Sequence, residues 1–243
     1  MMEALNLLGK APLVNVSICV SALEKAMKRP AHLPGIVTFT GPSGFGKSTA
    51  AAIASNRFDA VYVQAKSSWT RKAAHLAILK EMNIAPAKTL YGMAEQVAEQ
   101  LALSRKPLIV DECDFLLKNG TIEIVRDIYE ASGAAIMLIG EEQLPARLRQ
   151  WERFHGRILT FALAEPASME DARGLCALYV HDVIIADDLL AKVHKQSKGS
   201  ARRICVNLEY IREEAADNGI STVDLAAWGD RPLFTGDAPT RRI

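Results

Sequence analysis

The residues with the clearest chemistry lie in one short run, GPSGFGKST, at positions 41–49. The run fits the pattern G-x-x-x-x-G-K-[ST], in which two glycines precede a lysine and a hydroxyl residue. The glycines allow the backbone to curl, so that successive N–H groups and the start of a helix point at phosphate oxygens. We therefore predict a phosphate-binding loop, made of Gly41, Pro42, Ser43, Gly44, Phe45, Gly46, Lys47, Ser48 and Thr49.

Two side chains of this loop have separate tasks. Lys47 neutralises the β and γ phosphates of a nucleotide, and Ser48 coordinates Mg²⁺. A dinucleotide fingerprint would require G-x-G-x-x-G, whereas the GFG of this loop is followed by Lys47, Ser48 and Thr49. A glycine-rich turn that matches by chance is the other alternative. The strand expected before the loop and the helix expected after it favour a site for ATP with Mg²⁺.

A pair of acids forms the second candidate group. The segment PLIVDECD places Asp111 and Glu112 at the carboxyl end of an apolar strand, where open α/β sheets bind their ligands. We expect Asp111 to hold Mg²⁺ through water and Glu112 to be the base that polarises the attacking water. An ordinary strand end with solvated acids is the alternative. Cys113 and Asp114 are interpreted as structural.

The elements that must position these groups follow an alternating pattern. Apolar β-rich runs alternate with segments of helical period, which predicts an α/β fold with a parallel sheet covered on both faces. The expected strands are 35–40, 60–63, 107–110, 134–139 and 157–163. The expected helices begin near Lys47, Thr70, Thr89, Thr121 and Gln143.

The strand signal stops after Pro166, where SMEDARGLCALYV opens like a capping box. From there we expect a purely helical segment, with helices at 168–181, 186–197 and 200–217. The predicted division is a helical lead-in at 1–34, a P-loop core at 35–165, a helical lid at 166–228 and a flexible tail at 229–243.

Composition limits the partners. The formal charge of +1 gives no global attraction to polyanions, so contact with nucleic acid would rest on local basic patches. The four cysteines have neither metal-ligand spacing nor the density of a disulfide scaffold, which fits a reducing cytoplasm. The scattered histidines suggest no metal site. The apolar stretch APLVNVSICVSAL is too short to cross a bilayer, so we expect no membrane partner.

The acidic pair carries a family resemblance. A glutamate directly follows the strand-end aspartate, and one strand lies between the phosphate-loop strand and the acidic strand in sequence. This pattern resembles the additional-strand branch of P-loop ATPases, and within that branch the chain resembles the AAA+ ATPases. The resemblance implies a five-stranded parallel sheet in the order 5-1-4-3-2, numbered along the chain, with a small C-terminal helical lid. It also implies hydrolysis of ATP to ADP and phosphate. AAA+ proteins further have a polar residue at the end of the fourth strand, an arginine that reaches a neighbouring subunit's nucleotide, and a lid arginine.

At the end of the fourth strand this sequence departs from the family. The segment IGEEQL places Glu141 or Glu142 where the family commonly has Asn, Ser or Thr, with Glu141 our candidate. A carboxylate beside the attacking water adds negative charge near phosphate, so we expect hydrolysis to be slow.

Two segments resemble the family's arginine motifs. RFHGRI resembles the arginine-finger segment, with Arg153 the candidate and Arg157 the reserve. Solvated arginines beside an edge strand are the alternative. KGSARRI resembles the lid motif G-x-x-R, with Arg202 the candidate and Arg203 its competitor.

The phrases GPSGFGKSTAAAIA, LIVDECD, LIGEEQL and GSARRI resemble the transposition ATPases, a group that includes phage Mu transposition protein B and relatives in bacterial transposons. The resemblance implies a phage protein in the cytoplasm of a bacterial host cell. It would assemble with ATP into a ring or helical filament on double-stranded DNA, without sequence specificity, and recruit or stimulate a transposase until hydrolysis releases it. We expect a shortened relative, in which DNA contact falls to the core. An AAA+ ATPase acting on a protein client and a nucleotide-dependent scaffold with little turnover are the alternatives.

The resemblance directs attention to a basic segment after the second strand, AKSSWTRKAAH, which has no nearby acid. The predicted DNA contacts are Lys66, Ser68, Trp69, Thr70, Arg71 and Lys72, with Trp69 available to stack on a base or wedge between bases. A basic helix start with a buried tryptophan explains the same residues. A second basic run spans 192–203 and is either a DNA contact or a solvated surface.

Overall fold

The structure is a computed structural model that describes residues 13–118 and 120–237. It divides into two compact units. The core unit comprises Val16–Pro42 and Lys47–Ala164, and the lid unit comprises Met1–Asn15, Ser43–Gly46 and Glu165–Ile243. Residues 1–12 of the expected lead-in and 238–243 of the expected tail lie outside the described residues.

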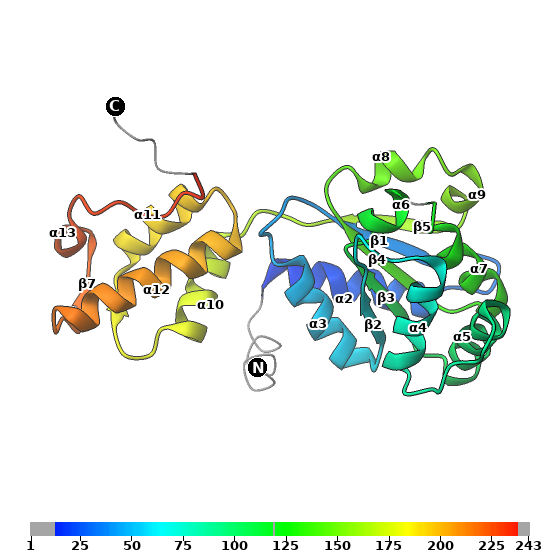
Figure 1. Cartoon of the computed structure of the whole chain (residues 1–243). Coiled ribbons are helices and arrows are strands. Elements are labelled where there is room, and N and C mark those ends of the chain that lie inside the picture. The colour runs from blue at the N-terminus through cyan, green and yellow to red at the C-terminus, as the bar shows by residue number, and fades with distance from the viewer. Residues whose placement is uncertain (1–12, 119, 238–243) are drawn as a thin grey trace, which may run out of the picture. The chain divides into compact units, whose positions relative to one another are not determined.

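The centre of the core unit is a five-stranded parallel sheet in the order β2-β3-β4-β1-β5 (Figure 1). This is the predicted order 5-1-4-3-2 counted from the opposite edge, so the predicted fold class is confirmed. The strands are β1 (Ile36–Thr40), β2 (Val61–Gln64), β3 (Leu108–Asp111), β4 (Ile136–Gly140) and β5 (Ile158–Leu163). Because Gln64 aligns with Asp111 and Thr40 with Gly140, the carboxyl ends of neighbouring strands meet along one edge.

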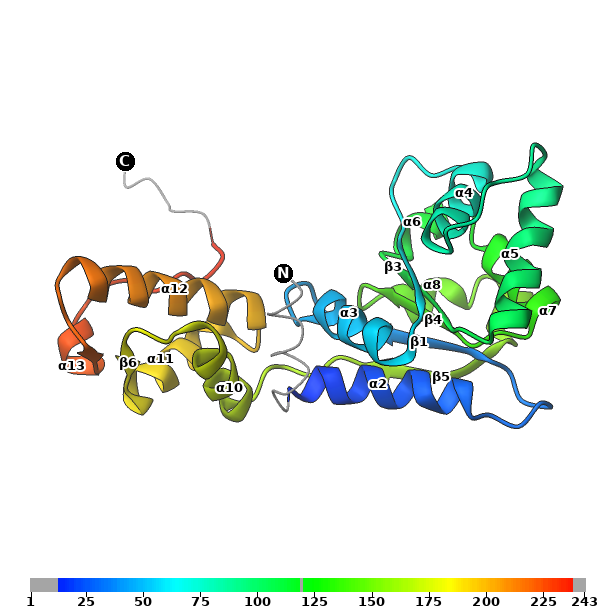
Figure 2. The ribbon, with the colours of Figure 1, turned by 90° about the horizontal axis from the view of Figure 1, so that it is seen from below.

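Helices cover both faces of this sheet (Figure 2). The helices α2 (Val14–Met27) and α3 (Lys47–Phe58) lie on one face, where Cys19 Sγ of α2 is 3.6 Å from Met137 Sδ of β4. The helices α4 (Arg71–Glu81), α5 (Leu90–Ser104) and α7 (Glu123–Ser132) lie on the other. The remaining helices of the core unit are the short α6 (Asp114–Lys118), α8 (Leu144–Leu148) and α9 (Glu152–His155).

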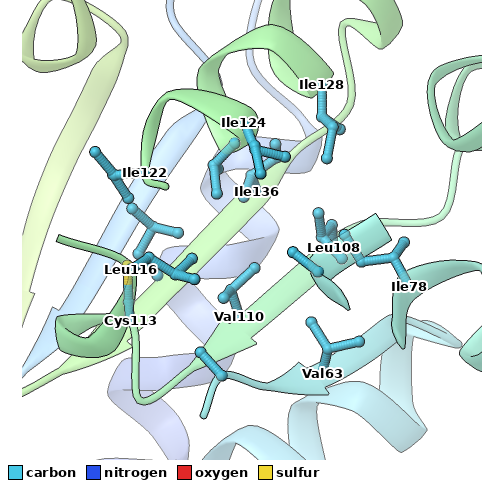
Figure 3. Close-up of a cluster of buried hydrophobic side chains, with 14 of the residues drawn as sticks. Val63, Ile78, Leu108, Val110, Cys113, Leu116, Ile122, Ile124, Ile128 and Ile136 are labelled. Atoms are coloured by element: carbon cyan, nitrogen blue, oxygen red, sulfur yellow. The ribbon is translucent and has the colours of Figure 1, made fainter. Parts of the chain in front are cut away.

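The face under α4, α5 and α7 holds the main apolar cluster (Figure 3). Alternate residues of the strands, among them Val63, Leu108 and Val110, point into it and meet Ile78 of α4 and Ile128 of α7. Branched aliphatic side chains suit a sheet buried on both faces, which is why the strands read as nearly continuous apolar runs.

Threonines begin two of these helices as expected. The Thr70 side chain accepts a hydrogen bond from the Ala73 amide, and the Thr89 side chain accepts one from Gly92. Such caps satisfy backbone donors that lack a partner within the helix. The start expected near Thr121 differs, because α7 begins at Glu123 without a side-chain cap.

The lid unit contains α10 (Met169–Tyr179), α11 (Asp187–Ser197), α12 (Ala201–Asp217) and α13 (Leu225–Trp228). The capping box is present between Ser168 and Asp171. The expectation of a purely helical segment was wrong, because β6 (Ile184–Ile185) and β7 (Thr222–Val223) form a small parallel pair. Two-residue strands are too short to show an alternating pattern, so sequence periodicity gives no signal for them.

The segment that follows α13 packs against the lid unit at Leu233 and Phe234. Leu233 is buried in the lid's apolar cluster, and the Asn207 amide group exchanges two hydrogen bonds with the backbone of Phe234. The flexible tail expected from residue 229 is therefore not loose at Leu233 and Phe234. Within residues 13–118 and 120–237, no helix is long and apolar enough to span a membrane.

Candidate active site

The phosphate-binding loop joins β1 to α3, and each of its three glycines has a structural reason. Gly44 and Gly46 have φ angles of 84° and 80°, in the left-handed region that side chains with a Cβ rarely adopt. A Cβ at Gly41 would lie 2.8 Å from the Cβ of Ala164, closer than two carbons can approach. The sequence pattern therefore describes a real backbone requirement at all three positions.

Lys47 is the first residue of α3 and turns back toward the loop. Its ammonium group donates hydrogen bonds to the carbonyls of Gly41 and Pro42, at 2.7 and 2.9 Å. Burial lowers the pKa of Lys47, and the negative charges of Asp111 and Glu112 oppose that shift. The lysine therefore sits in the electrostatic field of the acidic pair. Next to it, Ser48 is exposed and Thr49 is half-buried.

Asp111 ends β3 and is 2% exposed. One carboxylate oxygen accepts the backbone N–H of Glu112 at 2.8 Å, and the other accepts the hydroxyl of Tyr62 at 2.9 Å. A buried carboxylate requires such donors, because burial without hydrogen bonds is costly. Sequence analysis missed Tyr62; the available signal was one polar-tipped side chain in the otherwise apolar strand AVYV.

Glu112 has a φ angle of 52°, which is uncommon for a residue with a side chain. Strained backbone of this kind persists where the surrounding structure enforces it, often at functional sites. Burial raises the pKa of Glu112, and the charge of Asp111 raises it further. A higher pKa makes a carboxylate a better proton acceptor at neutral pH, which suits the predicted general base.

Asp114 links this acidic pair to the end of β4. It is 6% exposed, and it accepts the backbone N–H of Glu141 at 2.7 Å and the Arg147 guanidinium at 3.3 Å. A Cβ at Gly140 would lie 2.3 Å from the Asp114 carboxylate, so a glycine is required for this close approach. Asp114 was expected to be structural. Its hydrogen bonds to Glu141 and Arg147 hold the end of β4 beside the end of β3. Glu141 and Glu142 are both exposed.

The oxygen atoms of Ser48 and Asp111 suit Mg²⁺ as ligands. This ion prefers oxygen ligands and retains several waters in nucleotide sites. The protein would supply the Ser48 hydroxyl and the Asp111 carboxylate, and α3 packs beside the strand that carries Asp111. Over residues 13–118 and 120–237, there is no cluster of three or more His, Cys, Asp or Glu side chains placed to ligate a metal. The fit is thus to a metal held mainly by phosphate and water.

Part of the chain matches a known protein family, and solved structures share its fold. Residues 31–148 match a protein family model described as an AAA domain. Cdc6p from Pyrobaculum aerophilum has a similar structure, with a TM-score of 0.64 and 15% identity, covering 86% of this chain and 62% of that chain. The α/β fold, with a five-stranded parallel sheet in this order, is consistent with that of an AAA+ P-loop domain.

Two further solved structures are similar to this chain. The RuvB Holliday junction branch migration motor of Thermotoga maritima has a TM-score of 0.61 and 19% identity, over 88% of this chain and 66% of that chain. The ORC1 protein of Aeropyrum pernix, solved in complex with DNA, has a TM-score of 0.61 and 17% identity, over 86% and 61%. This chain thus spans less than two thirds of each of these proteins. None of the curated proteins matches its sequence.

The two candidate finger arginines differ in their surroundings. Arg153 lies exposed on α9, and the described part of the chain offers it no ion pair. Arg157 is paired with Glu130. Of the two, Arg153 is the one whose guanidinium is available to another molecule.

The lid arginines differ in the same way. Arg202 is exposed, and within the lid unit its backbone N–H donates to the carbonyl of Gly44 at 3.1 Å. Arg203 is half-buried, and its guanidinium packs closely against Gly236. A Cβ built at Gly236 would lie 2.7 Å from Arg203 Nε. Arg202 is therefore the more exposed of the two lid arginines.

The basic segment after β2 separates into two groups. Trp69 is half-buried against the apolar cluster, and Thr70 is occupied as the cap of α4. Both contacts match the alternative of a basic helix start with a packed tryptophan. Lys66, Ser68, Arg71 and Lys72 are exposed.

Proposed function

We propose that this chain is an ATP-dependent, DNA-binding AAA+ regulator of DNA transposition. It would assemble on target DNA in its ATP-bound form, recruit or stimulate a transposase, and leave the DNA after hydrolysis. The observation that carries the ATPase part is the buried Asp111 followed by the strained Glu112, with Lys47 in the field of both.

The chemistry follows from the positions of these groups. Loop N–H groups and Lys47 bind the phosphates, and bound Mg²⁺ supplies further positive charge on the phosphate oxygens. The Glu112 carboxylate, with its raised pKa, accepts a proton from the attacking water. The exposed Arg153 is available to stabilise charge on a neighbouring subunit's nucleotide.

The DNA part rests on the exposed cations Lys66, Arg71 and Lys72, which lie close together in sequence near the start of α4. Phosphate contacts of this kind bind DNA without reading its sequence. ORC1, a protein of similar fold, was solved with DNA, and RuvB is a branch migration motor acting on Holliday junctions. Transposition itself rests on the resemblance of the sequence motifs.

One observation favours a second candidate, a scaffold with little turnover. Glu141 and Glu142 put exposed carboxylates at the end of β4, where a positioning residue for the attacking water is expected. Negative charge there opposes charge developing on phosphate. Measured phosphate release separates the candidates, because in a scaffold Glu112→Gln leaves the rate nearly unchanged.

The proposal is tested by DNA binding with ATP and Mg²⁺, with ADP and Mg²⁺, and without nucleotide. Fluorescence anisotropy over a salt series should show binding that requires ATP and weakens steeply with salt, because counterions are released from DNA. Electron microscopy of the same mixture should show rings or filaments. Failure to bind duplex DNA with ATP at low salt would overturn the DNA part.

Charge-matched variants locate the contact. The combined change Lys66→Ala, Arg71→Ala and Lys72→Ala should lower the slope of log K against log salt by about 0.9 for each lost phosphate contact. Lys25→Ala, Lys80→Ala and Lys88→Ala remove the same charge from exposed positions elsewhere and should leave the slope unchanged. If the two triple variants changed the salt dependence equally, the attraction to DNA would depend on overall charge and not on this segment. Stimulation of strand transfer by the cognate transposase then tests the transposition part.

A further inference from the structure

The hydrogen bond between Tyr62 and Asp111 joins two neighbouring strands at the candidate metal site. The phenol hydroxyl donates to Asp111 Oδ2 at 2.9 Å, and Asp111 Oδ1 accepts the Glu112 amide at 2.8 Å. Each oxygen of this buried carboxylate thus has one protein donor. A carboxylate oxygen has a second acceptor position, so both can still accept a hydrogen bond from a metal-bound water.

The sheet fixes this pairing. Tyr62 aligns with Ile109, and Gln64 aligns with Asp111, in the parallel register of β2 and β3. Since side chains alternate along a strand, Tyr62 and Asp111 point to the same face. This is the face opposite the apolar cluster that receives Val63 and Val110, and it is the face on which α3 begins with Lys47. The hydroxyl therefore reaches Asp111 from the neighbouring edge strand β2, on the face of the sheet opposite the apolar cluster.

The phenol is the donor in this contact, because a tyrosine hydroxyl carries a proton at neutral pH and a carboxylate only accepts. Without that donor, Asp111 Oδ2 has no other hydrogen bond among the described residues, and the carboxylate can turn about its side-chain torsion.

We infer that Tyr62 is a positioning residue that holds the Asp111 carboxylate in the orientation needed to bind the hydration shell of a nucleotide-bound Mg²⁺. The inference rests on the proposed function, in which Asp111 binds Mg²⁺ through water. Partners that orient a metal-binding side chain typically change metal affinity by about 10- to 100-fold when they are removed. Tyr62 would act in this way on an aspartate that contacts the metal through water.

Tyr62→Phe tests the inference, because it removes the hydroxyl and keeps the ring. Binding of a fluorescent ATP analogue is measured in Mg²⁺ and in EDTA, and Mg²⁺ is titrated at fixed nucleotide. We expect the Mg²⁺ concentration for half-maximal effect to rise about tenfold, with affinity in EDTA unchanged. The matched control is Tyr129→Phe, which changes a half-buried tyrosine packed on the apolar cluster and should leave both quantities unchanged.

A double variant separates positioning from packing. If Tyr62 acts through Asp111, adding Tyr62→Phe to Asp111→Asn should produce almost no further change in the Mg²⁺ requirement. Equal losses in Mg²⁺ and in EDTA would assign Tyr62 to packing and overturn the inference. An unchanged Mg²⁺ requirement in Tyr62→Phe would overturn it too. If the wild-type protein gains no affinity from Mg²⁺, the proposed metal site itself fails.

Discussion

The Asp114 carboxylate accepts the backbone N–H of Glu141 at 2.7 Å, which ties the first residue of α6 to the residue after β4. This contact joins the acidic segment that follows β3 to the end of β4. The two neighbouring strand ends are therefore held together by one buried side chain.

Asp114→Ala should lower the free energy of unfolding by about 1–3 kcal/mol, because the Glu141 amide loses its acceptor. We also expect slower phosphate release with ATP affinity retained, since the end of β4 loses its anchor. Denaturant melts and a phosphate-release assay measure the two effects. Arg147→Ala removes only the half-exposed partner and should cost less than about 1 kcal/mol. An equal loss in both variants would assign the effect to the ion pair.

Lys47→Ala should weaken ATP binding by at least about tenfold, because a charge-assisted contact with phosphate is lost. Titration with a fluorescent ATP analogue measures this loss. Lys80→Ala removes an exposed lysine from the end of α4 and should bind as the wild type does. Retained nucleotide affinity in Lys47→Ala would contradict the assignment of the loop.

Glu112→Gln should retain ATP binding and reduce turnover by about a hundredfold or more, because the general base is removed. It should also change the dependence of stability on pH. Burial raises the pKa of Glu112 in the folded protein, so the folded state binds the proton more tightly than the unfolded state. Wild-type stability then falls as pH rises from the ordinary value of 4.5 through the raised value.

The melting temperature of Glu112→Gln relative to wild type should therefore be higher at about pH 8 than at about pH 4. Thermal melts without nucleotide, at constant ionic strength, measure this difference. A wild-type protein that gained stability over Glu112→Gln with rising pH would show that the carboxylate is stabilised by its surroundings.

Arg153→Ala should keep ATP binding and reduce turnover of the assembled protein by about a hundredfold or more, as expected for an arginine finger. Arg157→Ala breaks the exposed pair with Glu130 and should leave turnover close to that of the wild type. Subunit mixing is the sharper measurement. Arg153→Ala subunits mixed with Lys47→Ala subunits should regain activity, since each supplies what the neighbour lacks. The reverse ranking of the two arginines would make Arg157 the finger.

Much of the fold could be predicted from the sequence, because the patterns that indicate strands and helix starts are local. The apolar runs and the capping threonines gave the strands and most helix starts within a few residues. The acids at 111 and 112 came directly from their place after an apolar strand. In each case the residues that carry the signal are neighbours along the chain.

The contacts that sequence did not reveal join distant segments. Tyr62 and Asp111 are 49 positions apart, and Asp114 and Glu141 are 27 apart. Each depends on strand register, which a single sequence does not specify. The pair β6 and β7 was missed because its strands are too short to show a period. Trp69 could equally stack on DNA or pack inside, and only the apolar cluster around it distinguishes these outcomes.

The left-handed backbone of Glu112 has a consequence for engineering. Holding a residue with a Cβ there costs about 1 kcal/mol or more of folding free energy, which a glycine would not incur. Glycine at this position would relieve the strain and remove a partly buried charge, but it would also remove the carboxylate that we propose as the general base. Screens that select for thermal stability alone should therefore favour loss of the proposed general base at residue 112, and stabilising changes are better sought in the lid unit.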